Sequence, residues 1–203
     1  MKLPLYQIDA FASKVFTGNP ATVVPLGEWL PDETMQAIAM ENQLSETAFM
    51  IPGEEKVALR WFTPEIEVDL CGHATLASAH VLFSELGWDG DSVVFSSRSG
   101  DLTVLSLGSQ LEMDLPSDEL NSAEPEKDRV SAALGCRLLE LWRGRDDYMA
   151  VVEDESVVRG LKPDMRAVLD LPVRGILVTA PGEAVEFVSR CFFPAAGIDE
   201  DPV

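Results

Sequence analysis

The chain has 203 residues, 46% hydrophobic and 25% charged, a globular composition that allows one large domain or two small lobes. Its formal charge of −20 argues against nucleic acid and membrane surfaces as partners, because both need a basic face. Three cysteines without paired spacing, no signal peptide and no apolar run of about 18 residues indicate a cytoplasmic protein.

In the first half of the chain, short strands are expected around two helices. The strand patterns cover 3–11, 21–25, 47–51, 57–63, 92–97, 102–107 and 110–115, and the helix patterns cover 31–42 and 73–86. The second helix is apolar around nearly its whole circumference, which is typical of a buried helix. We therefore expect a curved sheet to wrap it.

The second half repeats short strands with short helices. Residues 116–128 are acidic and contain two prolines, which predicts a linker. Helices are expected at 129–134 and 163–169, and strands at 138–142, 148–152, 175–179 and 184–193. The predicted organisation is an N-terminal lobe, 1–116, and a C-terminal lobe, 117–203.

The segment Cys71-Gly72-His73 carries the strongest chemical signal, because it leads from an extended stretch into the buried helix. A helix start has amide groups without intrahelical acceptors and a partial positive charge, so it attracts a carboxylate or an oxyanion. A second polar spot, Ser45-Glu46-Thr47, lies between a helix and a strand. Together the two segments predict a proton-moving site for a small acid, with Glu46 facing the helix start beside His73.

A faint internal repeat is visible at a shift of 130 residues. It places Arg60, Phe62, Pro64 and Asp69 on Arg190, Phe192, Pro194 and Asp199. On the same overlay Cys71 meets Asp201.

Six segments in order are similar to the phenazine biosynthesis protein F (PhzF)-like isomerase family, which resembles diaminopimelate epimerase in fold. They are 7–11 (QIDAF), 16–21 (FTGNPA), 43–49 (QLSETAF), 60–64 (RWFTP), 71–77 (CGHATLA) and 197–203 (GIDEDPV). The resemblance implies an α+β fold with two lobes, each a curved β-sheet or barrel around a central helix, and an active site in the cleft between them.

The resemblance also implies a reaction and its residues. It implies a homodimeric isomerase without metal or organic cofactor that moves a proton and a double bond on a small-molecule carboxylate. Glu46 is then the catalytic acid/base, and His73 and Asp201 complete the catalytic set. The remaining residues expected to bind substrate are Gly18, Asn19, Pro20, Ser45 and Gly72.

One departure from the family pattern predicts an incomplete second lobe. The family continues beyond the Glu-Asp-Pro segment at 200–202 into a second central helix, whereas this sequence stops at 203. The sequence therefore predicts a truncated chain. An inactive remnant that acts only as a binding module is one alternative function.

Cys71 leaves a further alternative open. Diaminopimelate-type epimerases use a cysteine in a similar Cys-Gly setting as a base, so the chain could be a cysteine-based amino-acid epimerase or racemase. We expect Cys71 to be a small buried residue instead, because no second such cysteine occurs and Asp201 takes the overlaid position. The spacing of Cys71, His73 and His80 also fits no metal site.

Overall fold

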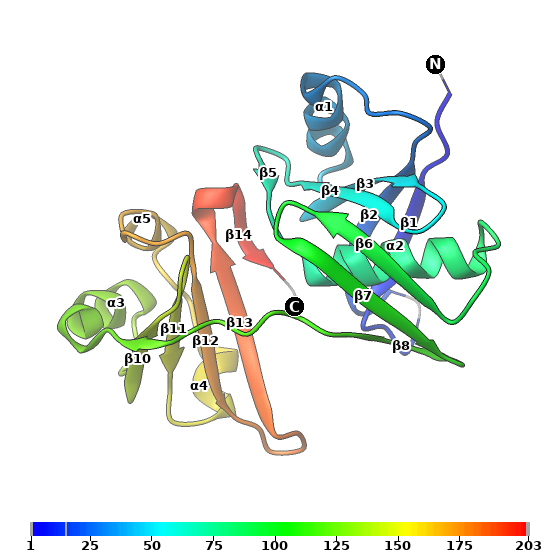
Figure 1. Ribbon diagram of the computed structural model, residues 1–203. Coiled ribbons are helices and arrows are strands. Elements are labelled where there is room, and N and C mark those ends of the chain that lie inside the picture. The colour runs from blue at the N-terminus through cyan, green and yellow to red at the C-terminus, as the bar shows by residue number, and fades with distance from the viewer. Residues whose placement is uncertain (1, 15, 202–203) are drawn as a thin grey trace. The chain divides into compact units, whose positions relative to one another are not determined.

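The computed structural model of the protein describes residues 2–14 and 16–201 (Figure 1). The chain divides into two compact units, Met1–Pro116 and Ser117–Val203. In the described part of the chain, no helix has both the length and the apolar character needed to cross a membrane.

The first unit is built on one mixed sheet of eight strands. They are β1 (Tyr6–Ala10), β2 (Asn19–Pro25), β3 (Glu46–Pro52), β4 (Val57–Phe62), β5 (Glu67–Val68), β6 (Ser92–Ser97), β7 (Gly100–Leu107) and β8 (Gln110–Met113). The order across the sheet is β1-β2-β3-β4-β6-β7-β8, and β5 pairs with β4. The pairs β2–β3 and β4–β6 are parallel and the others are antiparallel.

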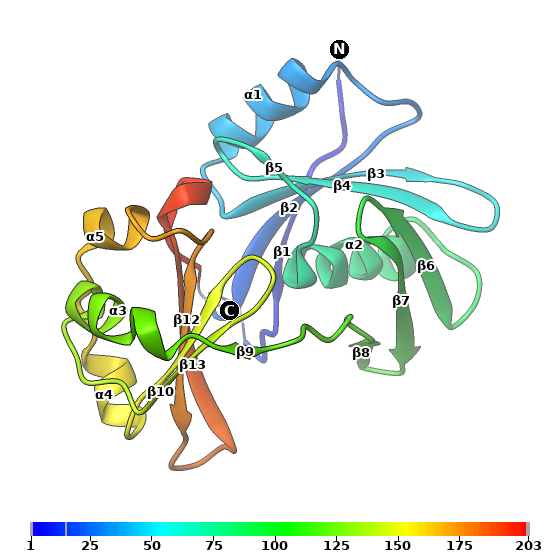
Figure 2. The ribbon, with the colours of Figure 1, turned by 60° about the vertical axis from the view of Figure 1, so that its left-hand side comes forward.

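Helix α2 (Gly72–Ser84) lies inside the curl of this sheet (Figure 2). It contacts β1 and β2 near one edge and β8 at the other, and a sheet reaches one helix from both edges only if it is curved. Eight residues of the helix are buried, among them Ala74, Ala77 and Leu82. The structure therefore confirms the predicted buried helix inside a curved sheet.

Helix α1 (Asp32–Asn42) covers the opposite face of the same sheet (Figure 1). Successive residues of a strand point to opposite faces, and β3 shows the result. Ala48 and Met50 join the core around α2, whereas Phe49 packs with Met35 and Ala39 of α1. Both faces of the central strands are thus buried, which explains their continuous apolar runs.

The second unit holds a six-stranded sheet in the order β14-β13-β12-β11-β10-β9. Its strands are β9 (Asn121–Ser122), β10 (Glu140–Arg143), β11 (Tyr148–Val151), β12 (Ile176–Pro181), β13 (Phe187–Phe193) and β14 (Ile198–Asp201). Among these described strands β11 and β12 pair in parallel, and the other pairs are antiparallel.

Three short helices accompany this sheet and lie on the same side of it in Figure 2. They are α3 (Lys127–Leu134), α4 (Glu155–Gly160) and α5 (Met165–Leu169). Their buried side chains, such as Val130, Val158 and Val168, share one core with Tyr148 and Phe192 of the strands. Two 3₁₀ turns, η1 (Glu124–Glu126) and η2 (Pro194–Ala196), complete the unit.

The predicted linker 116–128 is wrong in its second half. Strand β9 pairs with β10 through Ser122 opposite Trp142, η1 comes next, and α3 begins at Lys127. The buried side chain of Ala123 attaches this stretch to the core of the second unit. The acidic composition of the stretch therefore reflects its solvent-exposed side and not a linker. Strands β5 and β14 and helix α4 were not predicted, because two to six residues are too short to show a period.

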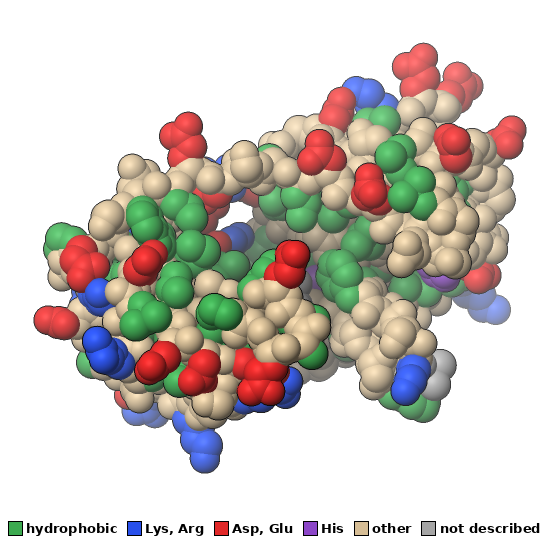
Figure 3. Space-filling view, turned by 90° about the horizontal axis from the view of Figure 1, so that it is seen from below, with side chains coloured by type: hydrophobic (Ala, Val, Ile, Leu, Met, Phe, Trp, Pro, Cys, Tyr) green, Lys and Arg blue, Asp and Glu red, His purple; other side chains and the backbone are tan. Residues whose placement is uncertain are grey.

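The acidic balance of the composition is visible on the surface. Side chains of Asp and Glu lie scattered over the face drawn in Figure 3, with fewer Lys and Arg among them. The chain has 35 acidic and 15 basic residues.

Candidate active site

Glu46 opens strand β3 and points to the inner face of the sheet. It shares strand parity with Ala48 and Met50, which pack against α2, so its side chain faces the same helix. Only 7% of the residue is exposed. A buried carboxyl group needs polar neighbours, which directs attention to the groups that surround it.

The start of α2 supplies those neighbours. Cys71 is the N-cap residue, with an extended backbone (φ −148°, ψ 113°), and Gly72 and His73 are the first two helical residues. The hydroxyl of Thr75 donates to the carbonyl oxygen of Cys71 at 2.6 Å and holds the turn closed. The helix start therefore brings a thiol, an imidazole and the first-turn amides together, as the sequence indicated.

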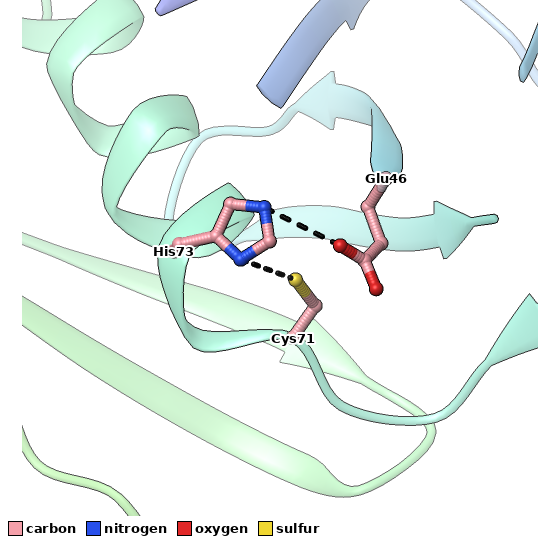
Figure 4. A group of neighbouring side chains, drawn as sticks. All are labelled: Glu46, Cys71 and His73. Atoms are coloured by element: carbon pink, nitrogen blue, oxygen red, sulfur yellow. Dashed lines mark hydrogen bonds and ion pairs between the residues drawn. The ribbon is translucent and has the colours of Figure 1, made fainter. Parts of the chain in front are cut away.

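Glu46, His73 and Cys71 form one buried chain of contacts (Figure 4). Glu46 Oε2 lies 3.3 Å from His73 Nε2, and His73 Nδ1 lies 3.5 Å from Cys71 Sγ. His73 is 2% exposed and Cys71 is 7% exposed. The imidazole thus stands between a carboxyl group and a thiol, with one ring nitrogen turned to each.

The charge state of His73 follows from its burial. Loss of water contact lowers the pKa of this histidine from 6.5 to about 4, because the interior disfavours the charged form. The ring is consequently neutral at pH 7, with one N–H donor and one bare nitrogen acceptor.

The same three residues are close enough to be considered as metal ligands. One possible ligand atom from each lies within 4.8 Å of the others. However, the carboxyl group approaches Nε2 and the thiol approaches Nδ1, so the two contacts use opposite sides of the ring. A metal ion binds a single ring nitrogen, and this arrangement therefore fits two separate polar contacts of the ring better than a shared coordination centre.

Two of the predicted substrate-binding residues lie beside Glu46. Asn19 is fully buried at the start of β2, on the face that Ala21 shares, and Ala21 is the register partner of Glu46. Ser45 Oγ lies 3.4 Å from Asn19 Oδ1 and donates to it. The structure thus brings Asn19 and Ser45 to the same end of the inner sheet face.

Gly18 and Pro20 have backbone roles in this structure. Gly18 has φ +86°, and a Cβ atom there would lie 2.2 Å from the carbonyl oxygen of Ala10. Only glycine fits that position. Pro20 has the opposite strand parity to Asn19, so its ring points to the other face of the sheet.

Asp201 belongs to the second unit and is described within it. It is 9% exposed and stands opposite Cys191 in the β13–β14 register. The pKa of the Cys191 thiol is raised to about 12, first by burial and then by the charge of Asp201. The described contacts of Asp201 therefore lie on the strand pair that carries it.

Cys71 makes a contact that the sequence analysis did not predict. It is small and buried, as predicted, but its sulfur also contacts the His73 ring. The available signal was its position: an N-cap residue lies next to the first-turn side chains, and a single glycine separates it from His73.

The architecture places this chain in the α+β class with a diaminopimelate epimerase-like fold, a curled sheet around one helix that starts with an acid/base group. The model of the phenazine biosynthesis-like family (PhzC-PhzF) matches residues 8–203. The chain belongs to this family. The match covers residues 8–203, and nothing in it bears out the prediction that the chain is truncated.

Individual relatives agree with this assignment. An uncharacterized isomerase of Pseudomonas aeruginosa is 48% identical over 205 residues, covering 100% of this chain and 78% of the relative. The phenazine biosynthesis-like domain-containing protein of Homo sapiens is 35% identical, covering 100% of this chain and 80% of that protein. The crystal structure of a PhzF-family protein from Enterococcus faecalis has 45% identity and a TM-score of 0.85, covering 100% of this chain and 78% of that chain.

Proposed function

We propose that this protein is an isomerase that moves a proton, and with it a double bond, on a small carboxylic acid, using no metal or organic cofactor. The observation that carries the proposal is the 3.3 Å approach of Glu46 Oε2 to His73 Nε2 at the buried start of α2. Relatives named isomerases support the reaction class.

Glu46 is the proposed base and acid. A buried carboxyl group holds its proton more tightly than an exposed one, which suits a group that must take and return a proton near neutral pH. Only 7% of the Glu46 residue is exposed, so its carboxyl group is largely shielded from water. The neutral His73 ring lies 3.3 Å from the carboxylate and does not cancel its charge.

The start of α2 is the proposed anion site. The amides of Gly72 and His73 lie in the first turn, where the helix dipole favours a negative charge. A substrate carboxylate there would be held beside Glu46. The same amides would stabilise the negative charge that spreads onto the carboxylate when a neighbouring carbon loses its proton. Asn19 and Ser45 add polar groups at that end of the sheet.

The proposed step balances without a co-reactant. The Glu46 carboxylate takes a proton from a carbon of the substrate, and the C–H electron pair becomes part of a new double bond. The electrons of the former double bond then take the proton back from Glu46 at another carbon. Substrate and product have the same atoms and the same charge, which is what an isomerase requires.

The test is proton exchange from solvent. Unsaturated and aromatic small carboxylic acids are incubated with the protein in D2O containing a chelator, and deuterium uptake and isomer formation are followed by NMR. We expect Glu46→Gln to lower the rate by roughly 10²–10⁴-fold, the usual contribution of a general acid–base group. Glu41→Gln, an exposed glutamate in α1, is the matched control and should keep the rate.

Retained turnover in Glu46→Gln would remove Glu46 from the role of base. Loss of turnover in the chelator, restored by added metal ion, would contradict the cofactor-independent reaction. Thermal unfolding of both variants shows whether a loss of rate has a structural origin.

A cysteine-based epimerase is the second candidate, favoured by the 3.5 Å contact between Cys71 Sγ and His73 Nδ1 at a helix N-terminus. Alkylation by iodoacetamide separates the two candidates. Inactivation that substrate prevents would favour Cys71, whereas an alkylated and active enzyme would favour Glu46. The experiment is run in Cys136→Ser protein, because Cys136 is more exposed than Cys71 and Cys191 and would otherwise react first.

Three further parts of the proposal rest on the family resemblance. We assign Asp201 a role in catalysis, tested by the rate of Asp201→Asn. We expect a homodimer, so light scattering should give twice the 22.2 kDa mass of the chain. We expect the protein in the cytoplasm, which cell fractionation tests.

A further inference from the structure

Glu46, His73 and Cys71 raise a question that the proposed reaction leaves open, namely where the ring proton of His73 resides. A neutral imidazole carries one proton, on either Nδ1 or Nε2, and each position gives a different set of hydrogen bonds. The proton position decides whether His73 supports Glu46 as a base.

The contact with the Glu46 carboxylate sets one requirement on the position of the ring proton. Before reaction the base must be ionised, and an ionised carboxylate only accepts hydrogen bonds. Glu46 Oε2 lies 3.3 Å from His73 Nε2, so the ring favours the carboxylate only when the proton is on Nε2. A bare Nε2 would place two lone pairs against each other in a buried site.

The other end of the ring then needs a donor. With the proton on Nε2, Nδ1 is a bare acceptor, and a buried acceptor left without a donor costs free energy. The atom that faces it is Cys71 Sγ at 3.5 Å, within the range of a hydrogen bond to sulfur. A thiol can supply the missing proton.

The local backbone explains why the sulfur is available for this contact. An N-cap side chain usually accepts from the amides of the first turn. Cys71 holds the N-cap position of α2 but makes no such bond, and its side chain turns to the ring instead (Figure 4). The low pKa of His73, caused by burial, keeps the ring neutral, so the contact is not that of a thiolate–imidazolium pair.

We propose that Cys71 is a positioning residue: its thiol donates to Nδ1 of His73 and so holds the ring proton on Nε2, facing the Glu46 carboxylate. This inference rests on the proposed function of Glu46 and deepens it. When Glu46 has taken a proton, the carbonyl oxygen of its neutral carboxyl group can still accept from Nε2–H. The ring then keeps the same tautomer, with the thiol donating to Nδ1, in both stages.

The test reads the tautomer directly, by ¹⁵N NMR of protein labelled in histidine. The chain has two histidines, and His80→Gln assigns the second signal, since His80 is exposed. We expect the wild-type His73 ring to carry its proton on Nε2. Cys71→Ala should shift the population to Nδ1, Cys71→Ser should restore Nε2, and Cys136→Ala, a thiol in the other unit, should change nothing.

Activity supplies a second reading. We expect Cys71→Ala to lower kcat roughly tenfold, equivalent to about 1.4 kcal/mol, with little change in KM, and Cys71→Ser to recover most of the loss. A wild-type ring protonated on Nδ1, or a tautomer that Cys71→Ala leaves unchanged, would overturn the inference. Loss of activity in Cys71→Ala with an unchanged tautomer would also overturn it and would favour a direct role of the thiol.

These results are separable from a failure of the proposed function. The NMR spectra are recorded on resting protein and need no substrate, so they decide the role of Cys71 even if Glu46→Gln keeps its turnover. The wild-type spectrum alone can overturn the inference if Cys71→Ala does not fold.

Discussion

Helices α4 and α5 of the second unit begin differently from α2 of the first. In the second unit, the Asp154 side chain accepts from the Val157 amide at the start of α4, and Asp164 caps α5. In the first unit, the Cys71 side chain begins α2 without a capping bond to a first-turn amide. An aspartate cap satisfies the amides and places a negative charge on them. The start of α2 has no acidic cap, and the carboxyl group of Glu46 lies beside it instead.

Each unit contains a long strand joined by a turn to a short strand, and the two pairs are alike. In β4, Arg60 pairs through two nitrogens with Glu67 of β5 and lies over the Phe62 ring. In β13, Arg190 pairs in the same way with Glu200 of β14 and lies over the Phe192 ring. The repeat seen in the sequence therefore has a structural counterpart, a clamp that joins a long strand to a short one.

In the first unit the clamp leads directly to the candidate site. After β5 the chain enters Cys71, Gly72 and His73 and then the 13-residue helix α2. After the second clamp the last described residue is Asp201. The shared element joins two strands of the sheet, and in the first unit the proposed chemistry lies in the segment that follows it.

The largest expected effect concerns the two cores. Leu82 of α2 and Leu134 of α3 are each 1% exposed, and truncation of a buried leucine to alanine costs about 2–5 kcal/mol. Leu82→Ala should lower the hydrogen-exchange protection of the first unit, and Leu134→Ala that of the second. The controls are the exposed leucines Leu86 and Leu169. Equal losses from control and core variants would contradict the packing described.

The second prediction concerns pH and applies to the first unit, since both histidines of the chain lie there. The pKa of His73 is about 4 in the folded protein and 6.5 in the unfolded chain. As pH falls from 6.5 towards 4, the unfolded chain gains a proton that the folded protein does not, so stability is lost, by about 3 kcal/mol in total. Above pH 6.5 this contribution is constant.

Urea unfolding followed in the first unit at pH 7 and pH 5 measures this slope. His73→Gln should remove it, and the difference between wild type and variant isolates the histidine from the many carboxyl groups. His80→Gln is the control, because that side chain is exposed. The same fall in stability with pH in His73→Gln protein would show that the slope has another origin.

The third prediction compares the two clamps. The side chains of Arg60 and Glu67 are 16% and 12% exposed, against 25% and 39% for Arg190 and Glu200. Loss of one partner costs more as the remaining charge is more buried. We expect Arg60→Met to cost about 2–3 kcal/mol, between the values for exposed and buried pairs, and Arg190→Met about 1 kcal/mol. Equal costs in thermal unfolding would show that burial does not set the difference.

The sequence could predict the parts of the fold that repeat over many residues. Helix 73–86 was recognisable because it is apolar on all sides, and the structure has α2 at Gly72–Ser84. Strands such as β6 (Ser92–Ser97) were recognisable from turn residues on either side. Strand β5 has two residues and helix α4 has six, which is too short to show a periodic sequence pattern. Strand β5 is defined by its pairing with β4, and α4 by its aspartate cap.

The candidate site was predictable to a similar degree. A glycine before the buried helix pointed to His73, and the polar Ser-Glu-Thr segment pointed to Glu46. Their 3.3 Å approach depends on the β2–β3 register and on the curl of the sheet around α2, which no local pattern encodes. The contact of Cys71 with His73 depends on one χ angle, and a sequence cannot give that.

The smallest expected effect returns to the helix starts. Asp164 accepts from the amides of Arg166 and Ala167 at 3.0 and 3.3 Å. Asp164→Ala should therefore cost about 1 kcal/mol of stability in the second unit, the usual value for a lost N-cap, and Asp164→Asn should keep most of it because asparagine caps almost as well. Chemical unfolding followed by hydrogen exchange in α5 measures both. A matching loss in Asp164→Asn would mean that charge, and not the cap, stabilises this helix, and the contrast with the uncharged start of α2 would then be one of electrostatics alone.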